Sequence, residues 1–281
     1  MEILSLKTTS MGNTVKRVLF VNSEITPYLP ETEISKIGRY LPQGIQERKK
    51  EIRSFMPRYG CINERKNQLH EVIRLSGMNI VINDVDRPLV IKVASISAAR
   101  MQVYFIDNED YFHRKSVYCD DKGEFFKDNA ERAIFFARGV LETVKKLRWA
   151  PDVIHCQGWI SQVLPLYLKK AYIDDPIFSH SKVVLSLYGD TPADFSEDFK
   201  SKILFGGVTE SDVEILSEPT GINLAKLAAS YADGIILGAE DVAPELVEFS
   251  NNSGLPVLPF SAEALQSGSY IEDYNSFYDN L

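Results

Sequence analysis

The chain has 281 residues, of which 44% are hydrophobic and 25% are charged, so it is long enough to bury a sizeable core. Its 39 acidic and 31 basic residues give a formal charge of −8, and this balance argues against binding to nucleic acids or to anionic membranes. The sequence shows no signal-peptide pattern and no apolar run of about 18 residues, so we expect a cytoplasmic protein without a membrane span.

Cysteine and histidine positions bear on metal and redox chemistry. Cys61, Cys119 and Cys156 are widely spaced, which fits neither a disulfide framework nor a metal-binding pair. The histidines also lack ligand spacing, so we predict no metal. Neither a glycine-rich phosphate loop of the common types nor a Gly-x-Ser-x-Gly elbow is present, so we predict no cofactor and find no support for serine hydrolase chemistry.

The first elements in chain order form a strand, a loop, a helix and a second strand. Residues 18–21 are an apolar run typical of a buried parallel strand. The apolar residues of 34–45 recur at helical spacing, and residues 52–56 are typical of the next strand. This β-loop-α-β opening predicts an α/β fold with a mostly parallel, Rossmann-like sheet that binds its ligand at the carboxyl ends of the strands.

The middle of the chain predicts a β-hairpin extension and a long helix. Residues 69–82, 89–93 and 101–106 are typical of strands joined by tight turns, one of them at residues 83–86. Residues 129–147 have apolar side chains on one face, which predicts an amphipathic helix.

Further buried strands follow, and their ends supply candidate binding residues. Residues 150–159 read as a strand that opens into a helix, and residues 182–187 read as another strand. The candidates for ligand contacts are Glu24, His155, Trp159 and Tyr188. A structural histidine and a packed tryptophan are the alternatives at two of these positions.

Five stretches carry a resemblance to a known family. Ser23-Glu24, Pro27-Tyr28 and Met56-Pro57-Arg58-Tyr59-Gly60 are similar to the start of bacterial glycogen synthases and plant starch synthases. The other similar stretches are residues 105–138, 150–159, 182–190 and 223–237. The resemblance implies the N-terminal lobe of a GT-B glycosyltransferase, with ADP-glucose as glucose donor and a glucan as acceptor.

The chain departs from the family pattern at the positions that serve the donor. The family's Lys-x-Gly-Gly-Leu loop, its Asp-Trp-His motif and its His-Asn pair are altered at Pro30, Thr32, Glu33, Gly158, Ile160, Tyr188 and Gly189. Glycine N–H groups and a lysine suit a diphosphate, whereas proline offers no N–H group and a glutamate repels a phosphate. The resemblance therefore predicts a degenerate donor site, and we assign no catalytic residue.

We predict three segments: a flexible N-terminus at residues 1–15, a synthase-like domain at 16–250 and an acidic tail at 251–281. The family carries a second Rossmann-like lobe, and the tail is too short to form one. Tyr270, Tyr274, Phe277 and Tyr278 have roughly helical spacing. We expect this helix to pack over the carboxyl-end face of the sheet, with Glu272, Asp273 and Asp279 facing outward.

Three hypotheses about function stay open. The first is a non-catalytic relative that binds a glucan or a partner in glycogen metabolism, including a second copy of itself. The second is the acceptor-positioning half of a split glucosyltransferase whose other lobe is a separate chain. The third is an unrelated small-molecule binder built on a Rossmann-like frame.

Overall fold

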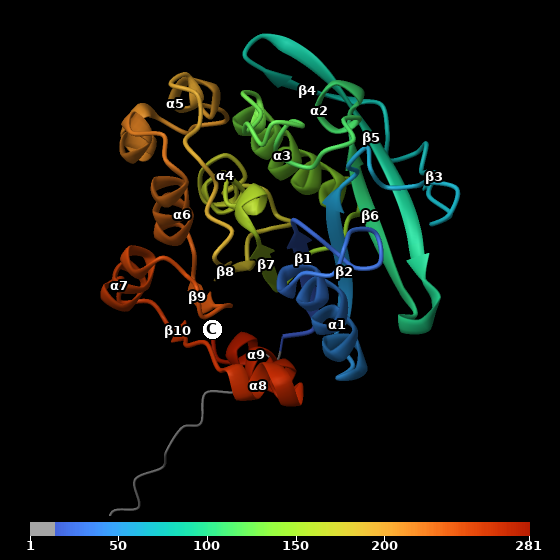
Figure 1. Cartoon of the computed structure of the whole chain (residues 1–281), viewed down its shortest axis with the longest axis vertical. Coiled ribbons are helices and arrows are strands. Elements are labelled where there is room, and N and C mark those ends of the chain that lie inside the picture. Colours follow the sequence, from blue (N-terminus) through green and yellow to red (C-terminus); the bar gives the residue numbers. More distant parts are fainter. Residues whose placement is uncertain (1–14) are drawn as a thin grey trace, which may run out of the picture.

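A twisted sheet forms the centre of the computed structural model, which describes residues 15–281 (Figure 1). Residues 1–14 of the predicted flexible N-terminus lie outside the described residues. Ten strands take the order β10-β9-β8-β7-β1-β2-β6-β5-β3, with β4 paired to β5. The strands are β1 Arg17–Asn22, β2 Glu51–Pro57, β3 His70–Glu71, β4 Met78–Ile82, β5 Val85–Ile96, β6 Met101–Asp107, β7 Val153–Gln157, β8 Lys182–Leu187, β9 Gly234–Leu237 and β10 Val257–Leu258.

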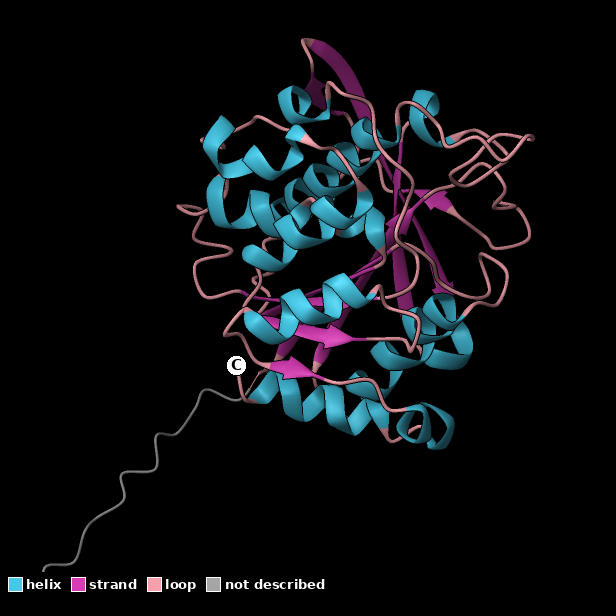
Figure 2. Ribbon diagram, turned by 60° about the vertical axis from the view of Figure 1, so that its left-hand side comes forward, coloured by secondary structure: helices cyan, strands magenta, loops and turns pink. Residues whose placement is uncertain are grey.

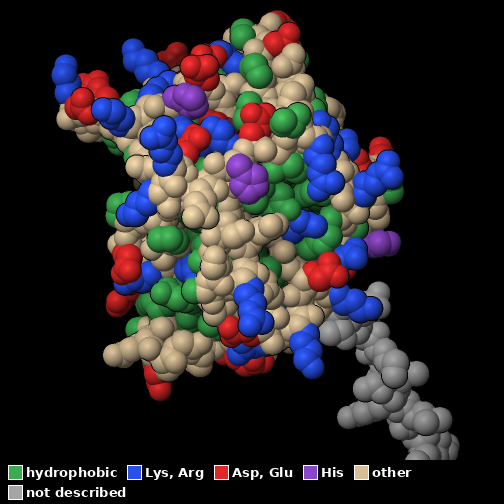
Figure 3. Space-filling view, turned by 90° about the vertical axis from the view of Figure 1, so that its right-hand side faces the viewer, with side chains coloured by type: hydrophobic (Ala, Val, Ile, Leu, Met, Phe, Trp, Pro, Cys, Tyr) green, Lys and Arg blue, Asp and Glu red, His purple; other side chains and the backbone are tan. Residues whose placement is uncertain are grey.

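Strand directions confirm the predicted mostly parallel sheet. All pairs from β10 across to β6 are parallel. Strand β5 is antiparallel to β6, β3 and β4, so the hairpin extension adds an antiparallel edge. Its tight turn is formed by Asn83 and Asp84 with φ of 50° and 59°, as expected for a two-residue hairpin loop. Figure 3 looks onto this side of the molecule and shows basic and acidic side chains interspersed over it.

Helices cover both faces of the sheet (Figure 2). The α-helices are α1 Glu33–Glu47, α2 Glu109–Phe112, α3 Asn129–Leu147, α4 Leu164–Lys170, α5 Phe199–Lys202, α6 Gly221–Ser230, α7 Pro244–Asn252, α8 Ala262–Ser267 and α9 Tyr270–Asp279. Helices α3, α4 and α6 lie on one face, and α1 and α9 lie side by side on the other (Figures 1 and 2). The predicted helix over residues 129–147 is confirmed as α3.

The opening β1–α1–β2 unit is stabilised by its buried apolar residues and by the cap at the start of α1. Residues 18–21 of β1 have no exposed side-chain surface, as a strand covered on both faces requires. Helix α1 begins with a capping box in which the Ser35 amide donates to the Thr32 hydroxyl (3.0 Å) and the Thr32 amide donates to the Ser35 hydroxyl (2.8 Å). Its apolar stripe is buried against β1 and β2.

The C-terminal residues form part of the same three-layer unit. Strand β10 adds to β9 beyond residue 250, and the tyrosine spacing noted in the sequence is found in helix α9. The expectation that this helix packs over the carboxyl ends of the strands is wrong, because α9 lies beside α1 on one of the two faces of the sheet. Ile271 packs against Gly44 of α1, and Phe277 reaches Gly234 at the start of β9. Apolar residues at helical spacing specify a buried stripe but not the surface that buries it.

Two acidic residues of α9 are exposed, as expected, and they also fasten the helix. Glu272 pairs with Arg48 at 2.8 Å, and Asp279 pairs with Lys50 at 2.8 Å. Lys50 is buried and also donates to the Asn275 side chain at 2.6 Å. The end of α1 and the start of β2 therefore hold both ends of α9 by charge as well as by packing.

Candidate functional site

Acidic side chains gather where four parallel strands end. Glu24 follows β1, Asp190 follows β8, and Asp241 follows β9, while the loop after β7 begins with Gly158. The carboxyl ends of neighbouring parallel strands meet at one edge of a sheet, which is the usual ligand-binding edge of an α/β fold. We call Ser23, Glu24, Asp190 and Asp241 the carboxyl-end site.

Missing side chains at two glycines allow these groups to approach one another. A Cβ atom on Gly158 would lie 2.0 Å from the Ser23 hydroxyl oxygen and 3.2 Å from Asp190 Oδ2. A Cβ atom on Gly189 would lie 2.1 Å from Asp241 Oδ2. Gly158 also has a φ of 82°, which favours glycine. The Ser23 side chain is buried, and its oxygen has no hydrogen-bond partner among the described residues. This hydroxyl can therefore still form a hydrogen bond beside Asp190.

The charges of the carboxyl-end site are mutually unfavourable. Burial raises the pKa of Asp190 to about 6, the Trp159 amide (2.9 Å) lowers it, and the negative charges of Glu24 and Asp241 raise it further. Burial likewise raises the pKa of Glu24, against a hydrogen bond from the Thr32 hydroxyl at 2.7 Å. None of these three carboxylates forms an ion pair within residues 15–281.

Two surface pockets adjoin this edge. One, of about 580 Å³, has Asp241, Glu240 and Glu33 in its wall together with side chains of α8. The other, of about 500 Å³, shares Glu33 with it and is bordered by Tyr40 of α1 and Tyr270 of α9. Carboxylates beside accessible aromatic rings, one exposed and one half-buried, suit a ligand with many hydroxyl groups and apolar C–H faces.

His155 lies apart from this edge. It is the third residue of β7, so its side chain points to the face of the sheet, where α9 covers it completely. Its Nε2 lies 2.6 Å from the Ser186 hydroxyl, and its Nδ1 lies 2.6 Å from the Tyr278 hydroxyl. Burial lowers the pKa of His155 to about 3, so the ring is neutral. The structure therefore does not bring His155 together with Glu24, and it acts as a structural histidine.

Trp159 and Tyr188 are at the edge but turn inward. Trp159 is 2% exposed, and its ring lies 4.8 Å from that of Tyr118 and 5.7 Å from that of Phe195. Tyr188 is buried against Gly238, and its hydroxyl donates to Gln157 Oε1 at 3.1 Å. Both aromatic rings therefore pack beneath the site, where Asp241 is exposed and Glu24 and Asp190 are half-buried.

The altered loop positions differ in their surroundings. Pro30 and Glu33 are exposed at the start of α1, and Thr32 is the helix cap that also donates to Glu24. Ile160 is fully buried in the short helical turn after β7, whereas Gly189 is exposed beside Asp241. Asp190 and Asp241 were not predicted as site residues from the sequence. The signal was an acidic residue a few positions after each of two predicted strands.

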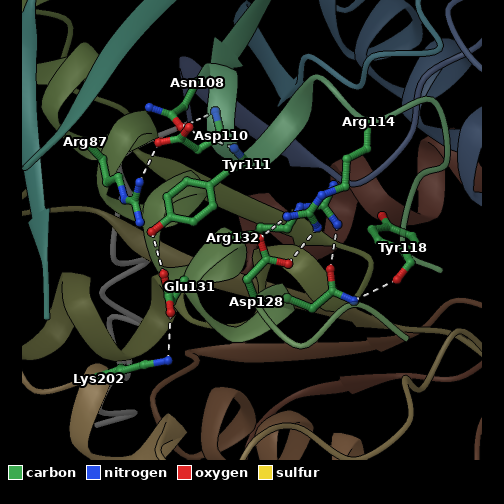
Figure 4. Close-up of polar contacts among 11 residues, drawn as sticks. Arg87, Asn108, Asp110, Tyr111, Arg114, Tyr118, Asp128, Glu131, Arg132 and Lys202 are labelled. Atoms are coloured by element: carbon green, nitrogen blue, oxygen red, sulfur yellow. Dashed lines mark hydrogen bonds and ion pairs between the residues drawn. The ribbon is translucent and has the colours of Figure 1, made fainter. Parts of the chain in front are cut away.

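A polar network holds the neighbouring loop in place (Figure 4). Arg114 pairs with Asp128 through both guanidinium ends, and the Asn129 side chain donates to the Tyr118 carbonyl at 2.8 Å. The Tyr118 hydroxyl lies 2.8 Å from that of Tyr59, and the charge of Arg132 is stacked on the Tyr59 ring at 5.9 Å. Burial raises the pKa of the Tyr118 hydroxyl well above its ordinary value, and the negative charges of Glu24 and Asp190 add to this shift.

Within the described residues, no group of three His, Cys, Asp or Glu side chains could hold a metal ion. No helix in residues 15–281 is long and apolar enough to cross a membrane.

Comparisons with known proteins agree with the resemblance. A glycogen synthase of Chlorobium phaeobacteroides is 33% identical over 235 residues, which are 80% of this chain and 48% of that protein. One of Chlorobium limicola is 39% identical over 173 residues, which are 61% of this chain and 35% of that protein. The chain thus spans less than half the length of these relatives.

A solved structure supports the fold. The catalytic domain of Starch Synthase IV from Arabidopsis thaliana, bound to ADP and acarbose, matches with a TM-score of 0.64 at 14% identity, covering 80% of this chain and 45% of that one. The sequence profile of the starch synthase catalytic domain matches residues 17–258. The chain therefore belongs to the starch synthase catalytic domain family.

Proposed function

We propose that this chain binds a neutral glucan at the carboxyl-end site and does not itself transfer glucose from ADP-glucose. The observation that carries the proposal is a set of three carboxylates, Glu24, Asp190 and Asp241, that form no ion pair within residues 15–281 and lie at the edge where the family resemblance places the donor. The family's enzymes provide the ligand class, since the relatives are glycogen synthases and the solved structure holds ADP and acarbose.

Electrostatics separate the two possible ligands. A pair of like unit charges 4 Å apart is unfavourable by about 1 kcal/mol in water and by about 4 kcal/mol near a protein surface. A diphosphate beside Glu24 and Asp190 would face several such pairs, and exposed Glu33 adds another negative charge nearby. Sugar hydroxyl groups instead donate to carboxylates, and charge-assisted hydrogen bonds are the stronger ones. The site therefore favours a glucan over ADP-glucose.

Groups that would stabilise a leaving diphosphate are replaced at the matching positions. Pro30 has no N–H group, Thr32 is used as a helix cap, and the Tyr188 hydroxyl is buried against Gln157. Losing one oriented donor typically lowers a rate by about 10²–10³. Several losses together predict transfer too slow to detect, which supports a binding role.

Isothermal titration calorimetry tests the proposal. Wild-type protein is titrated with maltoheptaose and with ADP-glucose, and we expect heat of binding only from maltoheptaose. The Asp190→Asn and Asp241→Asn variants each lose a charged acceptor, so we expect glucan affinity to fall roughly 10- to 100-fold. Asp174→Asn, an exposed change in the loop between α4 and the amino end of β8, is the matched control and should bind like wild type. Unchanged affinity in both site variants would refute the assignment.

A second candidate follows from the same acidic edge. A cationic protein surface, such as a separate glycosyltransferase lobe, would complement Glu33, Glu240 and Asp241, whereas a second copy of this chain would set acid against acid. Sedimentation of the chain with a full-length glycogen synthase tests this role. The proposal is supported if the complex dissociates at high salt and does not form with the Asp241→Asn variant. A dimer of the chain alone that persists at high salt contradicts it.

A further inference from the structure

A second polar cavity, of about 400 Å³, lies at the opposite end of the sheet from the carboxyl-end site. It is bounded by the amino ends of the parallel strands β2 and β6 and by the turn between β5 and β6, at the lower right of Figure 1. Two guanidinium groups, two amides and two hydroxyls make up most of its polar lining: Arg53, Arg100, Gln46, Gln102, Ser95 and Ser97. Among the described residues, no carboxylate lines it.

Arg53 is held in place by neutral partners. Its Nη1 donates to the Tyr104 hydroxyl at 2.5 Å, and its guanidinium carbon lies 5.1 Å from the centre of the Trp149 ring. The Trp149 ring is in turn fixed by its N–H group, which donates to Glu51 at 3.0 Å. The Arg53 Nε is buried without a hydrogen-bond partner in the described part of the chain. A guanidinium that is held by ring stacking and by a neutral hydroxyl is pre-organised for an anion.

Arg100 brings a second positive charge to the same cavity. It has a left-handed backbone conformation with a φ of 52° and ends the short 3-10 helix η1 Ser97–Ala99. The Gln46 side chain donates to the Ala99 carbonyl at 3.4 Å and so ties the turn to α1. Neither Arg53 nor Arg100 forms an ion pair within residues 15–281. Two cations that lack an ion pair in the described part of the chain stand out in one cavity, because the chain has a formal charge of −8.

We propose that this cavity binds the phosphate group of a small phosphorylated sugar. The planar guanidinium fork matches phosphate oxygens, and two arginines with no carboxylate leave a net positive lining. The amides of Gln46 and Gln102 and the hydroxyl of Ser95 can both donate to and accept from sugar hydroxyls. The volume is in the range of sites for small molecules, which are about 300–1,000 Å³. Because the two sites lie at opposite strand ends, such a ligand and a glucan would not compete.

Calorimetry with glucose 1-phosphate, inorganic phosphate and glucose tests the proposal on the intact chain. We expect glucose 1-phosphate to bind best, inorganic phosphate more weakly, and glucose without measurable heat. Replacing either cation, as Arg53→Met or Arg100→Met, should weaken glucose 1-phosphate binding roughly 10- to 100-fold. Arg74→Met removes an exposed arginine near the hairpin and is the matched control, which should bind like wild type.

Two further measurements keep the outcome decisive. Arg100 is exposed, so its variant should fold normally even if loss of the Arg53 stacking disturbs the protein. Arg53→Lys keeps the charge without the fork and should give an intermediate affinity. Wild-type affinity in both methionine variants would overturn the site, and equal affinity for inorganic phosphate and glucose 1-phosphate would overturn the sugar part. Neither result depends on whether the carboxyl-end site binds a glucan.

Discussion

Removing the hydroxyl of Tyr278 tests how α9 is held to the sheet. The Tyr278 side chain is 1% exposed, and its hydroxyl lies 2.6 Å from Nδ1 of the fully buried His155. Tyr278→Phe keeps the ring and nearly the whole volume, so no large cavity forms. It leaves the His155 nitrogen buried without a partner.

The expected loss of stability follows from that orphaned nitrogen. A buried polar group without its hydrogen bond destabilises the native state by about 1–3 kcal/mol. For a chain of this size, each kcal/mol lowers the melting temperature by about 2–4 °C. Urea unfolding followed by circular dichroism, together with a thermal melt, measures both quantities on the same preparation.

Tyr270→Phe is the matched control for this experiment. It sits on the same helix and is half-buried, and its hydroxyl forms no hydrogen bond with residues 15–281, so we expect a change within about 0.5 kcal/mol. Equal effects of the two substitutions, or no effect of Tyr278→Phe, would refute the argument that the bond to His155 fastens the helix.

Three other changes test neighbouring features. Burial lowers the pKa of His155 from its ordinary 6.5 to about 3, so the unfolded chain binds a proton that the native chain does not. The unfolding free energy should therefore fall as the pH drops from about 6.5 towards 3, by up to ~1.4 kcal/mol per pH unit, and urea titrations of His155→Gln should show a shallower fall. In Gly158→Ala, a φ of 82° is combined with a clash at 2.0 Å, so the unfolding free energy should fall by more than about 2 kcal/mol. Gly123→Ala is the control, because its φ is 81° but the space around it is open. It should show only the smaller backbone penalty, and thermal melts of both variants measure the difference. Lys50→Met removes the buried ammonium group that pairs with Asp279 and should lower the unfolding free energy by about 1–3 kcal/mol, and an unchanged urea midpoint would contradict this.

The fold was largely predictable because its strands and helices have strong local patterns. The apolar run at residues 18–21 became β1, and the helix expected over 129–147 is α3 with the same bounds. The acidic turn at residues 83–86 led to a hairpin, although β5 is longer than the strand expected at 89–93. Its extra residues pair with β4 at residues 85–88 and with β6 at residues 94–96, so the length of the strand is set by its partners in the folded sheet.

The position of α9 could not be predicted from local patterns. Tyr278 meets His155 across 123 residues of sequence, and the helical spacing of tyrosines is compatible with any apolar surface. The same contact removed His155 from the candidate site, because a strand residue points to one face or the other and only tertiary packing decides what covers it.

The candidate site was half predicted. Glu24 was expected at the end of β1 and is there, whereas Asp190 and Asp241 were not predicted, because nothing local in the sequence shows that their loops lie beside the loop of Glu24. What joins these three carboxylates is the order β9-β8-β7-β1, which places the loops after β1, β8 and β9 along one edge. That order is a property of the folded sheet.

The most direct test of the central claim is glucosyl transfer from labelled ADP-glucose to glycogen by the purified chain at high enzyme concentration, with heat-denatured protein as the blank. We predict incorporation no greater than the blank, because the positions matched to the family's donor loop carry a proline, a helix cap and acidic groups. Incorporation that rises with enzyme concentration and time would contradict the proposal and show that the carboxyl-end site handles a sugar nucleotide.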